Sequence, residues 1–114
     1  MTISQFISKL KEEPRQITFN DTMSVIDNHY NFTPCTFKNA DVINQSGENS
    51  GSCKLFYFAH LQQLCKEETL SCFGQYYTDV LNTPEGNDHQ NIRNFMKTGW
   101  DKISFDQIPL TKKI

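Results

Sequence analysis

The chain has 114 residues, a formal net charge of −2 and a hydrophobic content of 37%, to which nine Phe, four Tyr and one Trp contribute. This length suits one domain spanning residues 1–114, and the aromatic residues must supply much of its core. The basic residues are scattered, which argues against nucleic-acid binding, and no apolar run reaches the roughly 20 residues of a membrane span.

The first eleven residues contain neither the basic segment nor the continuous apolar block of a secretory signal. We therefore expect a cytoplasmic protein with reduced thiols. Its four cysteines, at positions 35, 53, 65 and 72, match the spacing of neither a zinc ribbon nor a redox dithiol. Most of them are expected to be small core residues.

Two amphipathic helices are predicted near the N-terminus. Thr2 can cap the first, in which apolar residues recur at helical spacing from Ile3 to Leu10, and Pro14 ends it. Thr18 opens the second, and Asp21, three residues later, approaches a capping box.

The segment 31–52 is irregular and is the longest connection in the chain. Within it, residues 35–38 and 41–44 alternate weakly in polarity, which predicts a short hairpin around Asn39 and Ala40. The remainder is rich in Asn, Gly and Ser. Long connections of this kind in small domains are usually functional or disordered.

The second half of the chain predicts three further helices. One covers residues 53–64, the next covers residues 66–81, and Thr83 with Pro84 begins the last, which Gly99 ends. A tail beyond Trp100 is expected to fold back over the core. The predicted fold class is therefore mainly α: a single compact domain of about five helices, with at most a short β-hairpin between the second and third.

A candidate anion site lies where the polar loop 44–54 runs into the third helix. Small, turn-forming residues stop abruptly there, so Ser50 or Ser52 is a natural N-cap. The first N–H groups of a helix lack internal partners and attract anions. The candidate binding residues are Asn49, Gly51, Ser52 and Lys54, with the N–H groups of residues 52–54 and the Lys54 ammonium as donors. The alternative is a long loop that ends in an ordinary cap.

A second polar run, residues 88–93, precedes the apolar stripe of the last helix. Its simplest interpretation is a solvated first turn, with Asp88 favourable near the helix N-terminus. The functional interpretation brings His89 and Arg93 to face the 44–54 loop. Together they would form a polar pocket for an anion or a peptide carboxylate.

Catalytic and metal sites are the other classes considered. Cys53 and His60 are seven residues apart on one helix, too far for a thiolate–imidazole pair, so a nucleophilic centre would combine Cys53 with His89. The alternative for Cys53 is a buried, inert thiol. Residues 53, 60, 88 and 89 could in principle hold a metal, but their spacing is not diagnostic. We expect no catalytic residue, metal or cofactor.

Several blocks of the chain resemble, in order, the HopJ type III effector family of bacterial proteins. These blocks are Asn31–Pro34, Phe37–Asn39, Gly47–Lys54, Cys72–Tyr77, Asp79–Leu81, Thr83–Pro84, Asp88–Arg93 and Gly99–Trp100. The family usually has Asn-Gly where this chain has Asn39-Ala40, which weakens the expectation of a tight two-residue turn there. The resemblance covers nearly the whole chain.

The resemblance implies more about fold than about activity, because it carries no particular reaction, cofactor or catalytic residue. It does add delivery by a type III secretion system as an alternative to cytoplasmic residence. We expect a small, non-enzymatic binding or effector-like protein. It would recognise an anionic ligand or a protein partner through the 44–54 loop and the 88–93 helix start, and the alternative is an enzyme with a Cys53/His89 centre.

Overall fold

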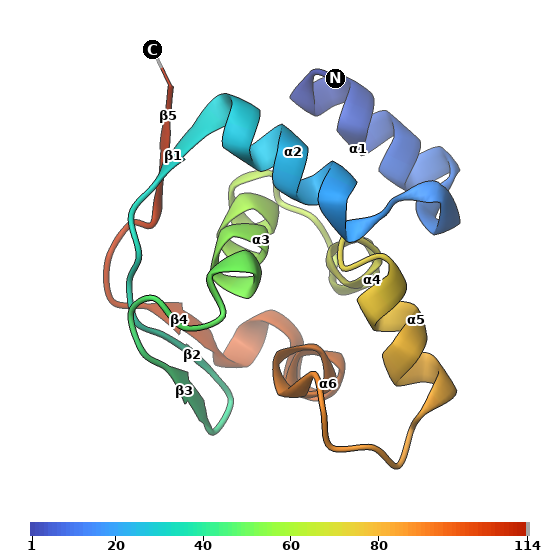
Figure 1. Cartoon of the computed structure of the whole chain (residues 1–114), viewed down its shortest axis with the longest axis vertical. Coiled ribbons are helices and arrows are strands. Elements are labelled where there is room, and N and C mark those ends of the chain that lie inside the picture. The colour runs from blue at the N-terminus through green and yellow to red at the C-terminus, as the bar shows by residue number, and fades with distance from the viewer. Residues whose placement is uncertain (114) are drawn as a thin grey trace.

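The computed structural model describes residues 1–113 (Figure 1). In chain order they form α1 (Ile3–Glu12), the 3₁₀ turn η1 (Pro14–Gln16), α2 (Phe19–His29), β1 (Tyr30–Phe32), β2 (Phe37–Asn39), β3 (Val42–Asn44), α3 (Ser50–Leu61), α4 (Lys66–Ser71), α5 (Gln75–Asn82), α6 (Gln90–Thr98), the 3₁₀ turn η2 (Gly99–Lys102), β4 (Ile103–Phe105) and β5 (Leu110–Lys112). In Figure 1, α1 and α2 lie at one end with both termini, and α6 lies at the other. No helix within residues 1–113 is long and apolar enough to cross a bilayer.

The predicted N-caps Thr2 and Thr18 both form, and each is part of a reciprocal capping box, which the sequence had indicated for Thr18 alone. The Gln5 N–H donates to the Thr2 hydroxyl at 3.0 Å, and the Thr2 N–H donates to the Gln5 side chain at 2.8 Å. Thr18 and Asp21 repeat this arrangement at 3.1 and 3.0 Å. Each box satisfies backbone donors that a helix start would otherwise expose, which fixes where α1 and α2 begin.

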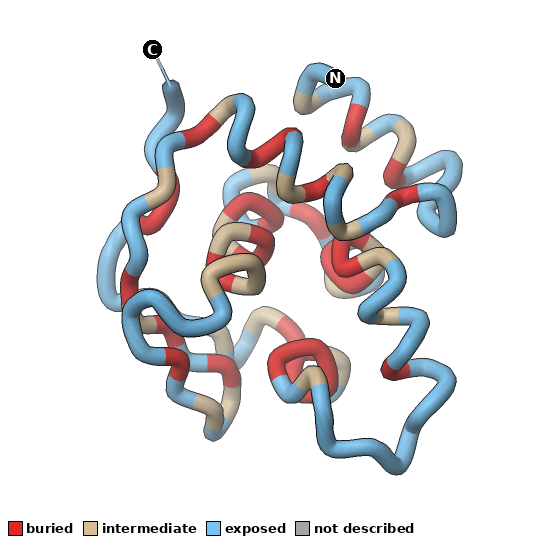
Figure 2. Tube along the Cα trace, in the orientation of Figure 1, coloured by how far each residue is buried: buried red, intermediate tan, exposed pale blue. Residues whose placement is uncertain are grey.

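Helix α3 is the centre of the core, and Figure 2 shows much of it as buried. Phe56 and Phe58 are both fully buried. The Phe56 ring lies 4.9 Å from that of Phe95 on α6, whereas the Phe58 ring lies 5.9 Å from that of Phe6 on α1. One helix therefore joins the two ends of the molecule through aromatic contacts.

The helix predicted over residues 66–81 is two helices, α4 and α5, because Gly74 breaks it. Gly74 has a positive φ of 59°, and a Cβ there would lie 2.6–2.9 Å from backbone atoms of Thr18 and Phe19. The Thr22 hydroxyl also donates to the Cys72 carbonyl at 2.8 Å. The start of α2 thus approaches position 74 so closely that only glycine fits there. With its positive φ, Gly74 interrupts the helix predicted over residues 66–81.

The predicted hairpin forms, with β2 pairing antiparallel to β3 and Ala40 taking a left-handed conformation (φ 57°) in the tight turn. The prediction of no further strand was wrong. The C-terminal tail does fold back, but as strands: β4 pairs with the other side of β2, and β5 pairs with β1. The fold is a single domain of mixed α and β structure. An extended tail needs backbone partners, and the free edges of β1 and β2 supply them.

Candidate functional site

Helix α3 begins at Ser50, three residues earlier than predicted, and its N-cap is Asn49 rather than a serine. Asn49 has left-handed backbone angles (φ 50°, ψ 44°), and within residues 1–113 its side chain makes no capping hydrogen bond. Its carbonyl accepts the Cys53 N–H at 3.0 Å. The donors without a helical partner are therefore those of residues 50–52, not those of residues 52–54.

Helix α6 begins in the same way. Its N-cap, His89, has φ 50° and ψ 47°, makes no side-chain capping bond among the described residues, and accepts the Arg93 N–H at 3.1 Å. The N–H groups of residues 90–92 are then the ones without a helical partner. A left-handed residue followed by a right-handed helix gives a concave row of N–H groups, an arrangement that binds anions.

Both helix starts line one cavity of about 570 Å³, which we call the helix-start hollow. Asn49, Gly51 and Ser52 contribute from α3, and residues 87–92 contribute from the start of α6. Aromatic rings complete the wall, supplied by Phe19, Phe73 and Tyr76. The structure thus brings four of the six predicted binding residues, Asn49, Gly51, Ser52 and His89, to one hollow.

The amide of Asn44 ties the two helix starts together. Its side-chain oxygen accepts the Asn49 amide at 2.7 Å and the Asn91 amide at 2.9 Å. Its nitrogen donates to the Asn91 side-chain oxygen at 3.2 Å. Asn44 is buried at the end of β3, so the hairpin holds Asn49 of α3 and Asn91 of α6 at a fixed separation.

Further asparagines extend this network into the hairpin. The Asn39 amide donates to the backbone carbonyl of Asn91 at 2.7 Å, and the Asn94 amide donates to the backbone carbonyl of Asn39 at 3.2 Å. The sequence reasoning did not single out these residues. The available signal was Asn44 in the predicted strand 41–44, where asparagine is unfavourable unless a partner satisfies its side chain. Asn39 gave no such signal, because it lay in the predicted turn, where asparagine is common.

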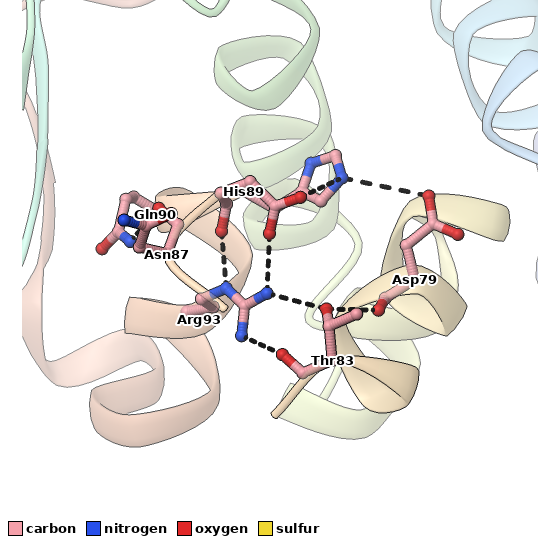
Figure 3. Close-up of polar contacts among 7 residues, drawn as sticks. Asp79, Thr83, Asn87, His89, Gln90 and Arg93 are labelled. Atoms are coloured by element: carbon pink, nitrogen blue, oxygen red, sulfur yellow. Dashed lines mark hydrogen bonds and ion pairs between the residues drawn. The ribbon is translucent and has the colours of Figure 1, made fainter. Parts of the chain in front are cut away.

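Arg93 does not line the hollow and instead holds the connection between α5 and α6 (Figure 3). Its guanidinium donates to the Thr83 carbonyl at 2.8 Å, the Thr83 hydroxyl at 3.0 Å and the Asp88 carboxylate at 2.7 Å. The hydrogen bond from Arg93 lowers the pKa of Asp88. Thr83 ends α5 rather than beginning the last helix, since Arg93 draws the segment after it into a loop.

Lys54 also lies outside the hollow lining. Its ammonium is 2.9 Å from the Asp27 carboxylate and lies 5.0 Å from the centre of the Phe32 ring. His89, by contrast, lines the hollow, with its Nε2 atom 3.9 Å from carboxylate oxygens of both Asp79 and Asp88. Its ring centre is 5.5 Å from that of Tyr76. His89 is thus the predicted ionisable side chain that reaches the cavity.

Cys53 is a buried thiol beside another thiol. Its Sγ lies 3.9 Å from that of Cys35, both residues are buried, and burial raises the pKa of Cys53 to about 12. A thiol held neutral in this way is a poor nucleophile. Within residues 1–113, no three His, Cys, Asp or Glu side chains gather to hold a metal ion.

The fold and the hollow define a small globular protein built around converging helix starts. The model of the HopJ type III effector protein family matches residues 3–110, and the chain belongs to that family. A crystal structure of VPA0580, a protein of unknown function, is similar with a TM-score of 0.97 and 52% sequence identity, covering 99% of this chain and 95% of that one. No curated protein matches the chain.

Asn44→Ala should lower the free energy of unfolding by about 1–3 kcal/mol, because it leaves the buried amide of Asn91 without its acceptor and removes the contact to the exposed Asn49. Chemical denaturation followed by circular dichroism measures this loss. Asn31→Ala, on an exposed part of β1, is the matched control and should cost under about 0.5 kcal/mol. Equal small effects of the two substitutions would contradict the role given to Asn44.

Only one of the four thiols, that of the exposed Cys65, should react rapidly with an alkylating reagent at neutral pH in the native protein. Peptide mapping by mass spectrometry identifies the labelled site.

Cys53→Ser should lower the free energy of unfolding by about 1–3 kcal/mol, because it buries a hydroxyl without a good partner. Cys53→Ala should lower it less. Rapid native labelling of Cys53 would instead reveal an activated nucleophile.

Proposed function

We propose that the protein is a non-enzymatic binding protein that holds a small anionic group in the helix-start hollow. The observation that carries this proposal is the convergence of two helix starts, each entered through a left-handed residue, on one cavity. Left-handed non-glycine residues cost free energy and gather at functional sites. Asn and His, the residue types found at the two N-caps, are among those that tolerate this conformation best.

The electrostatics of the hollow support an anion. Each helix start carries a partial positive charge of roughly half an electron, and two of them act on the same cavity. Asp88 lines the hollow with a negative charge, but Arg93 neutralises it at 2.7 Å. The His89 ring faces the carboxylates of Asp79 and Asp88, each 3.9 Å from its Nε2 atom, so the two helix starts supply the positive charge of the hollow. The balance favours a ligand such as a phosphate, a sulfate or the carboxylate of a peptide.

The Lys54 ammonium was expected to donate hydrogen bonds to the anion. Its ion pair with Asp27 argues for a different role. Since the Lys54 ammonium already contacts Asp27 and the Phe32 ring, we assign the binding donors to the backbone of residues 50–52 and 90–92. Arg93 likewise acts by fixing the loop that carries His89.

The enzyme alternative with a Cys53/His89 centre has less support. Cys53 faces Cys35 in the core, whereas His89 lines the hollow, whose wall includes Ser52 but not Cys53. A binding role needs only the preorganised N–H groups, and it makes no demand on the thiol.

The family name describes proteins delivered by type III secretion, and this route remains the alternative to cytoplasmic residence for this chain. Such export requires an unfolded N-terminus, yet Phe6 and Leu10 of α1 are buried in the core. We therefore propose that the folded form acts in the cytoplasm, and that any export would require α1 to unfold first.

Phosphate should stabilise the native protein by mass action, and a concentration ten times the dissociation constant would add about 1.4 kcal/mol to the free energy of unfolding. For a domain of this size this raises the melting temperature by about 4–8 °C. Ser52→Asp places a fixed negative charge at the hollow. It should therefore raise the melting temperature without phosphate, through the helix dipole, but remove most of the phosphate response.

Ser4→Asp, at the start of α1, is the matched control because it makes the same change at an exposed helix start away from the hollow. It should keep the full phosphate response, and so should Lys54→Ala. If Ser52→Asp and Ser4→Asp respond to phosphate equally, the ion acts as a general salt and the hollow is not its site.

A further inference from the structure

A second cavity of about 550 Å³ lies on another face of the molecule, away from the helix-start hollow. Tyr57 and His60 from α3, Trp100 from η2 and Phe105 from β4 supply four of its lining side chains, and Asp106 adds a carboxylate. We call this site the aromatic groove. The volume lies within the range that suits small-molecule ligands.

The rings of the aromatic groove are held in place from behind. The Trp100 indole N–H donates to the Leu64 carbonyl at 3.1 Å, and its ring packs edge-on against Phe95 with centres 5.0 Å apart. The ring of buried Phe37 stacks on that of Phe105 with centres 5.9 Å apart. These contacts keep the groove preformed, so a ligand would lose little affinity to ordering it.

The rings also face different directions. Tyr57 and Phe105 stand at 89° to each other with centres 5.0 Å apart, and the His60 and Trp100 rings are tilted by 53° at 6.1 Å. An aromatic face carries partial negative charge, so rings set at steep angles around a cavity attract a cation lodged among them. Edge-to-face pairs are also the ordinary packing of aromatic rings, so what points to a cation is the gathering of four rings around one cavity together with a carboxylate.

The groove also carries a negative charge, which would attract a cation. Asp106 lines it, whereas among the lining residues of the described chain there is no Lys or Arg. An anion would meet a carboxylate and the negative faces of the rings. A compact, weakly hydrated cation would be attracted both by the Asp106 carboxylate and by the faces of the aromatic rings.

We propose that the aromatic groove binds a small quaternary ammonium compound, with its alkylated nitrogen against Tyr57, Trp100 and Phe105 and its charge balanced by Asp106. A quaternary ammonium group sheds water readily and presents an apolar surface with a positive charge, which suits aromatic rings better than a hydrated metal ion or a primary amine does. The site is separate from the helix-start hollow and does not depend on the function proposed for it.

Choline is the probe, and Trp100 is the reporter because it is the one tryptophan of the chain. At about pH 8, above the range in which imidazoles usually carry a proton, choline should produce a saturable change in tryptophan emission with a millimolar dissociation constant. The neutral isostere 3,3-dimethylbutanol has the same shape without the charge, and it should produce no saturable change. Ionic strength is held constant with sodium chloride.

Asp106→Asn keeps the shape of the groove and should weaken choline binding about three- to tenfold, whereas Tyr57→Leu should weaken it at least as much. Tyr76→Leu removes a ring from the helix-start hollow instead and should leave choline binding unchanged. Circular dichroism checks that each variant is folded. The proposal is overturned if choline gives no saturable change, if the neutral isostere gives the same change, or if Asp106→Asn binds choline like the unsubstituted protein.

Discussion

A single buried amide, that of Asn44, connects the fold to the candidate site. Its oxygen accepts hydrogen bonds from both Asn49 and Asn91, and its nitrogen returns one to Asn91. Because buried polar groups must be paired, these contacts fix the first turn of α3 relative to the first turn of α6. The hairpin that carries Asn44 is anchored in turn by β4, so the C-terminal tail also contributes to the geometry of the hollow.

The left-handed N-caps of α3 and α6 destabilise these helix starts, and the hydrogen bonds made by Asn44 offset part of that cost. Asn49 and His89 both adopt left-handed conformations, while α1 and α2 begin with ordinary capping boxes. The starts of α3 and α6 both open into the hollow, to which Phe19 of α2 also contributes its ring. A side-chain cap usually stabilises a helix start, so two starts without one that meet at a single cavity support a binding role.

Several features that depend on residues close together in the sequence were predicted correctly. The capping residues Thr2 and Thr18 and the glycine that ends α6 could all be read from the sequence, as could the meeting of the polar loop 44–54 with the start of α3. The break at Gly74 and the strands of the tail could not, because they depend on the close approach of α2 and on edges supplied by distant residues. Likewise, Lys54 and Arg93 were predicted as binding residues because of their positive charge. Their partners in the structure are Asp27, 27 residues from Lys54, and Thr83, 10 residues from Arg93.

We propose that the two helix starts act as one anion site, and amide chemical shifts during a phosphate titration test this proposal. We expect saturable shifts of the N–H signals of residues 50–52 and 90–92, all fitting one dissociation constant. The amides at the capped start of α1 serve as the internal reference and should remain unshifted. Shifts confined to one helix start, or spread over exposed lysines without saturation, would contradict it.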